Sequence, residues 1–143
     1  MRLRRLLLAV LVALLPLGAV SCGGKGNDRK PTYPVRGRVL FQGKPATGAL
    51  VMFHPAHEDD PAAVRPHGQV NGDGAFVLST YVAKDGAPAG EYVVTIDWRQ
   101  AIPGRSGGGP SILPPVYGTP KQSPLRATVK AESNDLTPFQ IDN

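Results

Sequence analysis

The side chains of this sequence most able to carry chemistry are one cysteine and three histidines. Cys22 is the only thiol, and it directly follows the small residues Ala19, Val20 and Ser21. The histidines lie in one acidic stretch that holds His54, His57, Glu58, Asp59, Asp60 and His67. Imidazole and carboxylate groups are common zinc ligands. Two kinds of chemistry therefore have to be weighed, covalent modification of a thiol and binding of a metal.

The spacing of the histidines argues against a metal site. His54 and His57 are three residues apart, which on an extended chain directs their side chains to opposite faces. Pro55 and Pro61 indicate an open loop between them and His67. We expect a solvated loop and no cofactor, and His54, His57 and His67 stay as the alternative zinc ligands. In the same way, residues 71–74 (NGDG) predict a hairpin turn, because the downstream carboxylate of a calcium loop is missing.

The segment before Cys22 has the order of a bacterial secretory signal. Three arginines lie within residues 1–5, and residues 6–15 contain only Leu, Ala and Val. Pro16 and Gly18 then interrupt the apolar run before the small residues. About ten apolar residues are too few for an ordinary membrane-spanning helix. Residues 1–21 are therefore predicted to be a signal peptide.

Cys22 after small residues resembles a bacterial lipobox. That resemblance implies cleavage before Cys22, lipidation of its thiol and acylation of the new amino terminus. Each buried methylene of an acyl chain contributes about 0.8 kcal/mol to membrane binding. We expect a lipoprotein anchored in the membrane of the cell envelope, facing the periplasm or the exterior. There are two alternatives. Ala19 and Ser21 would also suit an ordinary signal peptidase, which would export the chain without a lipid, and Cys22 could be a buried structural thiol.

Charge and composition narrow the remaining classes. The formal charge is +5, but removal of residues 1–21 takes away three arginines and leaves +2. No basic stripe interleaved with aromatic residues follows, so we expect no nucleic-acid partner. The 17 glycines and 15 prolines exclude a bundle of long helices, and a single cysteine excludes a disulfide scaffold. A chain of 143 residues leaves room for one domain after the signal.

The rest of the chain has the pattern of a β protein. Residues 22–32 are polar and predict a flexible tether, and residues 33–143 predict a single folded domain. Alternating or apolar runs separated by turn residues predict seven or so short strands, at 35–42, 49–54, 67–70, 75–80, 91–98, 125–131 and 137–141. Residues 99–124 are too rich in Gly and Pro for regular structure. The fold class expected is an all-β sandwich.

The order of several short motifs resembles the carboxypeptidase regulatory-like, transthyretin-like β-sandwich domains. The segments that carry the resemblance are 35–39 (VRGRV), 43–45 (GKP), 48–55 (GALVMFHP), 72–76 (GDGAF) and 86–96 (GAPAGEYVVTI). The later run at 113–118 (LPPVYG), followed by 123–125 (SPL) and 128–129 (TV), is similar to small lipoproteins abundant in planctomycete bacteria. The resemblance implies Greek-key topology and a noncatalytic accessory or binding domain, with an envelope protein or a glycan as possible partner.

An enzyme is not expected. A related sandwich hydrolyses hydroxyisourate with the help of a Tyr-Arg-Gly-Ser tail, whereas residues 140–143 here read QIDN. Tyr81, Trp98 and Tyr117 are the aromatic candidates for stacking on a sugar ring. The alternation of strand 91–98 places Trp98 with Tyr92 on the inward face, which favours a role at the edge of the core. Trp98 and Tyr117 remain the ligand-binding candidates, for a carbohydrate- or protein-binding module that uses the 99–124 loop.

Overall fold

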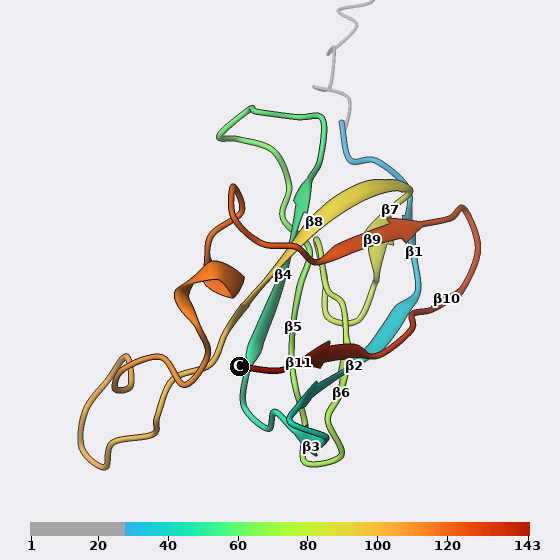
Figure 1. The fold of residues 1–143 in the computed structure, drawn as a ribbon. Coiled ribbons are helices and arrows are strands. Elements are labelled where there is room, and N and C mark those ends of the chain that lie inside the picture. The colour runs from blue at the N-terminus through green and yellow to red at the C-terminus, as the bar shows by residue number, and fades with distance from the viewer. Residues whose placement is uncertain (1–27) are drawn as a thin grey trace, which may run out of the picture.

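The computed structural model describes residues 28–143 and shows an all-β fold of two packed sheets (Figure 1). The signal peptide, Cys22 and most of the tether, all predicted from sequence, lie outside the described residues. Within 28–143, no helix is long and apolar enough to cross a bilayer. The predicted β-sandwich is confirmed at this level, and its Greek-key connectivity stays a prediction.

The first sheet is built around β2 (Val35–Phe41). On one side, β6 (Ala75–Val77) pairs antiparallel with the first half of β2, and β3 (Lys44–Pro45) pairs with its last residues. On the other side, β10 (Asn134–Asp135) and β11 (Phe139–Ile141) run parallel to β2. The carboxyl-terminal segment thus closes the sheet against the first long strand of the domain.

The second sheet has the order β5-β4-β8-β9, and every pair in it is antiparallel. It comprises β4 (Leu50–Pro55), β5 (His67–Gln69), β8 (Gly90–Asp97) and β9 (Arg126–Val129). A hairpin at residues 71–74 joins β5 to β6 and so links the two sheets. The side chain of Asn71 accepts hydrogen bonds from the backbone N–H groups of Asp73 and Ala75, and Gly74 has a φ of 80°. The predicted hairpin turn is confirmed, since Asn71 is used to form the turn itself.

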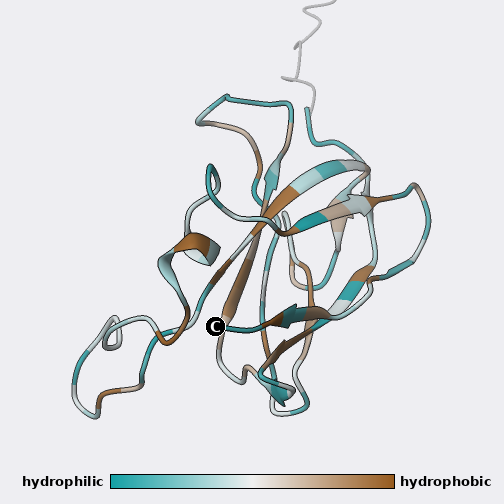
Figure 2. Ribbon diagram, viewed as in Figure 1, coloured by the Kyte–Doolittle hydropathy of each residue, from teal (hydrophilic) through white to brown (hydrophobic). Residues whose placement is uncertain are grey.

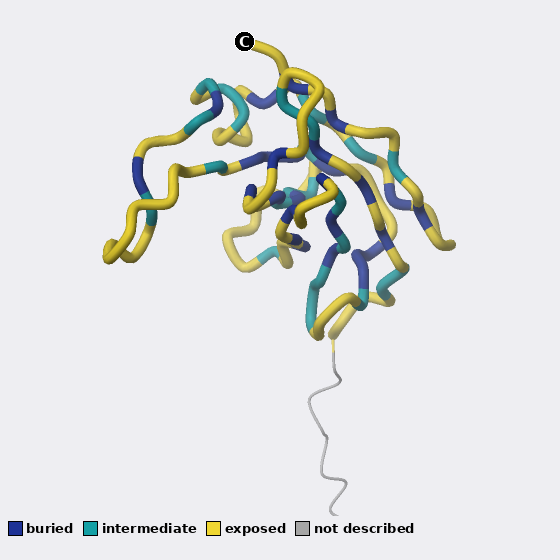
Figure 3. Tube along the Cα trace, turned by 90° about the horizontal axis from the view of Figure 1, so that it is seen from below, coloured by how far each residue is buried: buried dark blue, intermediate teal, exposed yellow. Residues whose placement is uncertain are grey.

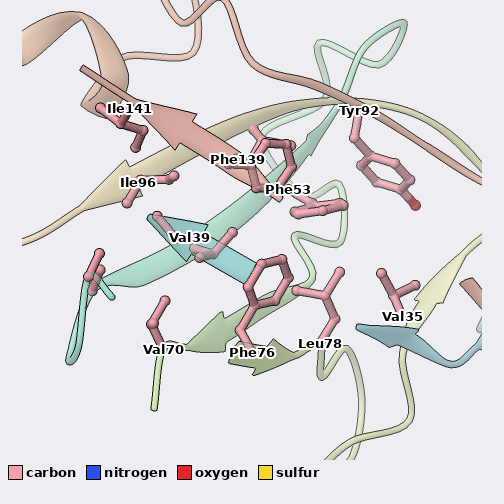
Figure 4. Packing of buried hydrophobic residues seen from close by; sticks show 14 of the residues in the cluster. Val35, Val39, Phe53, Val70, Phe76, Leu78, Tyr92, Ile96, Phe139 and Ile141 are labelled. Atoms are coloured by element: carbon pink, nitrogen blue, oxygen red, sulfur yellow. The ribbon is translucent and has the colours of Figure 1, made fainter. Parts of the chain in front are cut away.

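The core fills the space between the sheets with alternate side chains of each strand. On β2, Val35 and Val39 are fully buried while Arg36 and Arg38 are exposed, and on β8 the buried set includes Tyr92, Val94 and Ile96. Figure 4 shows Phe53 between Phe76 and Tyr92. Phe139 and Ile141 of β11 belong to the same cluster. Apolar residues follow the strands and buried residues lie where the sheets face each other (Figures 2 and 3).

One long segment runs beside the second half of β8 and packs against the core. Residues 112–124 contain the 3-10 helix η1 (Pro115–Gly118), and Leu113 of this segment is buried. The buried hydroxyl of Ser123 donates to the carbonyl of Val94 at 2.5 Å, which attaches the segment to β8. The segment is thus irregular, as its Gly and Pro content predicts, but it is held in one place.

A two-stranded ribbon fixes the start of the domain. β1 (Thr32–Tyr33) pairs antiparallel with β7 (Ala87–Pro88), so the folded domain begins one residue before the predicted boundary at 33. The two-residue strands β1, β3, β7 and β10 are absent from the seven predicted runs, because two residues carry no periodicity. The seven predicted strands all appear, and their ends differ from the predicted ones by at most three residues.

Candidate functional site

One cavity in the described part of the chain has a volume of about 860 Å³. It lies at the end of the sandwich where the described chain begins, and the segments that line it are at the top of Figure 1. Its walls come from the chain start at 28–30, the loop at 55–64, Tyr81 and residues 88–92. We call this cavity the N-terminal hollow. Its volume falls within the range of about 300–1,000 Å³ typical of ligand pockets.

The charges around the N-terminal hollow are mostly negative. Its lining includes four carboxylates, Asp28, Glu58, Asp60 and Glu91, against the single lysine Lys30. Lys30 Nζ lies 3.4 Å from Glu58 Oε2, and His57 Nε2 lies 2.7 Å from Glu91 Oε2. Both pairs are solvent-exposed, so each contributes at most about 1 kcal/mol to stability. The hollow is therefore suited to a partner that carries positive charge.

The other wall of the hollow is aromatic and apolar. Tyr81 Oη accepts a hydrogen bond from the backbone N–H of Lys30, and the Arg29 guanidinium carbon lies 5.2 Å from the Tyr81 ring centroid. Tyr92 is buried and donates its hydroxyl to the Pro88 carbonyl at 2.7 Å. Burial, with smaller contributions from Tyr81 and Glu58, raises the pKa of Tyr92 to about 12. The phenol therefore stays protonated and serves to position β8.

Tyr81 is held in place by a loop built on Asp85. The Asp85 carboxylate accepts hydrogen bonds from the backbone N–H groups of Thr80, Tyr81 and Val82. Burial opposes ionisation of Asp85, but these hydrogen bonds outweigh it, and the pKa of the carboxyl is lowered. The ionised Asp85 carboxylate thus fixes the backbone at Tyr81, the residue that forms the aromatic wall of the hollow.

The structure does not bring the three histidines together. His54 Nε2 lies 2.9 Å from Thr95 Oγ1, His57 pairs with Glu91, and His67 Nδ1 lies 3.4 Å from the Arg65 carbonyl. Within residues 28–143 there is no group of three or more His, Cys, Asp or Glu side chains able to hold a metal ion. Each histidine therefore has a partner of its own.

His54 predicts a pH dependence of stability. Burial of its ring, followed by the nearby Arg65 guanidinium, lowers the pKa of His54 below the usual 6.5. As the pH falls through 6.5 the unfolded chain takes up this proton first, so the free energy of unfolding decreases; above 6.5 both states are neutral and it stays constant. We expect the urea midpoint to fall between pH 7.5 and 5.5, and His54→Gln to flatten that fall. The matched control, His67→Gln, should keep the wild-type fall in the urea midpoint. If the midpoint of His54→Gln falls by as much as that of the wild type, the assignment to His54 is wrong.

The predicted aromatic ligand residues lie against the core. Trp98 Nε1 donates to the Thr47 carbonyl at 2.9 Å, and its ring meets Phe41 edge-on with centroids 5.9 Å apart. Tyr117 lies in η1 and packs, partly buried, against the same cluster. Their main contacts are structural, in agreement with the inward alternation of strand 91–98. A stacking platform of exposed rings is not formed by these two residues.

The 99–112 loop projects from the other end of the domain as a separate feature, which we call the arm (Figure 1, lower left). Its base is a short hairpin, with Gln100 N donating to the Pro110 carbonyl and Gly109 N donating to the Gln100 carbonyl. The arm contains Arg99 and Arg105 and no carboxylate; Arg99 pairs with Asp97 at 2.9 Å. Ile102 is 37% exposed and lies beside Gly109, where a Cβ would come within 2.9 Å of it.

These features define the class of the protein as a small β-sandwich domain with an acidic hollow at one end and a basic arm at the other. No protein-family model matches the chain, and no curated protein matches it in sequence. The hollow was not predicted from sequence, because its walls come from four segments up to 64 positions apart. The acidic stretch at 58–60 was its one visible signal.

Proposed function

We propose that this chain is a cell-envelope lipoprotein whose β-sandwich acts as a noncatalytic structural or interaction module. The proposal includes its relation to the carboxypeptidase regulatory-like, transthyretin-like domains. The observation that carries it is the position of Cys22. The thiol follows a signal-like segment and precedes the first described strand, which begins at Thr32, by only ten residues.

That spacing favours an anchored module. Lys30 lies eight positions after Cys22, and a fully extended chain of this length spans at most about 28 Å. An acyl anchor at Cys22 would hold the domain close to the bilayer, with the N-terminal hollow near the membrane. The arm, at the opposite end of β8, would then be presented away from the anchor.

The alternative proposal is a carbohydrate- or protein-binding module that uses the 99–124 loop. The arm favours the protein-binding form, because it offers an exposed Ile102 and the cation Arg105 on a projecting loop. Trp98 and Tyr117, the residues suited to a sugar ring, are in contact with the core. A glycan array in which binding is lost in Trp98→Ala or Tyr117→Ala would favour the carbohydrate form.

Lipidation predicts a complete change of location in one variant. Cells that express the chain are grown with a clickable fatty acid, and the labelled protein is measured in membrane and medium fractions. We expect label in the membrane fraction for the wild type and none in Cys22→Ser, because the thioether and the acylated amino terminus both need Cys22. Unlabelled wild-type protein released into the medium would overturn the proposal.

A further inference from the structure

We propose that the arm of one copy of this chain docks in the N-terminal hollow of a second copy, which links the copies head to tail. The inference names the partner of the interaction module and rests on that proposed role. It commits to a second copy because both halves of the contact, which are complementary in charge and in apolar surface, are present on one chain.

The hollow supplies an acidic receptor with an apolar wall. Glu58, Asp60 and Glu91 line it together with Val64 and Tyr81. Val64 is 37% exposed, and it is one of four large apolar side chains that the described domain leaves in solvent. The Asp60 carboxylate forms no salt bridge with the described residues, and the one hydrogen bond that it makes among them is accepted from the backbone N–H of Ala62 at 2.8 Å. A cation with an apolar neighbour would pair with these carboxylates and cover Val64.

The arm supplies such a ligand. Arg105 is exposed and makes no salt bridge or side-chain hydrogen bond within residues 28–143. No carboxylate occurs between Asp97 and Glu132, so nothing on the arm or the segment after it offsets this charge. Ile102, three residues before Arg105, is another of the four exposed apolar side chains. A bidentate contact of Arg105 with a carboxylate, next to burial of Ile102, is the arrangement expected at the centre of a small interface.

The arm and the hollow of one copy are too far apart to meet. Residues 90–92 at the start of β8 line the hollow, whereas the arm begins two residues after β8 ends at Asp97. Eight residues of β-strand span about 25 Å. The contact is therefore between copies, and it uses different surfaces on the two partners. Such contacts produce rings if the rotation closes and open rows if it does not.

The experiment is sedimentation velocity of the full chain in detergent, across protein concentrations and at low and high salt, with micelles in excess. We expect concentration-dependent association that weakens at high salt, since the contact is partly ionic. Arg105→Glu should raise the dissociation constant by about tenfold or more, the effect of reversing one interfacial charge. Adding Glu91→Arg should restore association toward the wild-type value. Lys44→Glu, the same charge change on the exposed strand β3, is the matched control.

Four results would overturn the inference. The first three are a wild type that stays monomeric at every concentration, an Arg105→Glu variant that associates as the wild type does, and equal weakening by Lys44→Glu. The third of these would indicate a general effect of net charge. A double variant that is not restored would contradict the specific pairing of arm and hollow. The readout does not depend on lipidation of Cys22, so failure here leaves the anchor proposal standing, and absence of label leaves this one standing.

Discussion

Replacement of Gly86 by alanine is expected to unfold the domain or to remove most of its stability. Gly86 has a φ of 88°, and a Cβ built there would lie 1.7 Å from the Tyr33 carbonyl oxygen and 2.4 Å from its carbon. Both contacts are with backbone, so no side-chain rotation relieves them. Separation of β1 from β7 would follow, because Tyr33 pairs with Ala87. We expect a loss of more than about 4 kcal/mol, the range in which a single substitution is exceptional.

Gly48→Ala separates the clash from the backbone strain. Gly48 has nearly the same φ, 87°, but nothing lies within 4 Å of the Cβ position. The left-handed conformation alone costs a residue with a Cβ about 1–2 kcal/mol. Urea unfolding followed by fluorescence of Trp98, the only tryptophan, measures both variants. If Gly86→Ala lowers the free energy of unfolding by no more than Gly48→Ala does, then β1 does not pack closely on the turn before β7.

Phe53→Ala is expected to have the second-largest effect, a loss of about 3–5 kcal/mol. Phe53 is fully buried on β4, and its ring centroid lies 5.5 Å from that of Tyr92 and 6.4 Å from that of Phe76. Since Phe76 belongs to the first sheet and Tyr92 to the second, Phe53 fills the space between them. Its removal leaves a cavity where the sheets meet. The whole domain has about 5–15 kcal/mol of stability to lose.

Val82→Ala serves as the matched control for Phe53→Ala. Val82 is a large apolar side chain that is 62% exposed, so its truncation should change the free energy of unfolding by less than about 0.5 kcal/mol. The two variants are compared by their urea midpoints at one pH. Equal losses would mean that the region around Phe53 is not the centre of the core.

The strands were predictable from the sequence because one face of each strand packs in the apolar core and the other faces water. On β2 the alternation of apolar and polar residues matches the buried and exposed sides, and on β8 it does so except at Thr95, which is buried beside His54. The turn at residues 71–74 was equally visible, because Asn and Gly are needed for its geometry. The parallel pairing of β10 and β11 with β2 was not visible, since the partners are about 100 positions apart and parallel register leaves no local signal.

The candidate site was predicted less well than the fold, for a physical reason. In the sequence, the acidic residues 58–60 and the histidines form a dense cluster of candidate metal ligands, but the loop places Glu58 beside Lys30 and His57 beside Glu91. These pairs join segments 28 and 34 positions apart, which no spacing rule connects. Trp98 was placed correctly because it extends the alternation of its own strand. Sites assembled from several loops thus need the three-dimensional structure.

The central claim, a β-sandwich module held to the cell envelope through Cys22, is tested most directly by mass spectrometry of the amino-terminal peptide. The protein is extracted from the membrane fraction of cells that express the full chain and digested with trypsin. The peptide that ends at Lys25 is then analysed. The predicted result is a peptide that begins at Cys22 and carries lipid on its thiol and an acyl group on its amino terminus. A peptide that begins at Cys22 with an unmodified thiol, or one that retains residues 1–21, would contradict the claim.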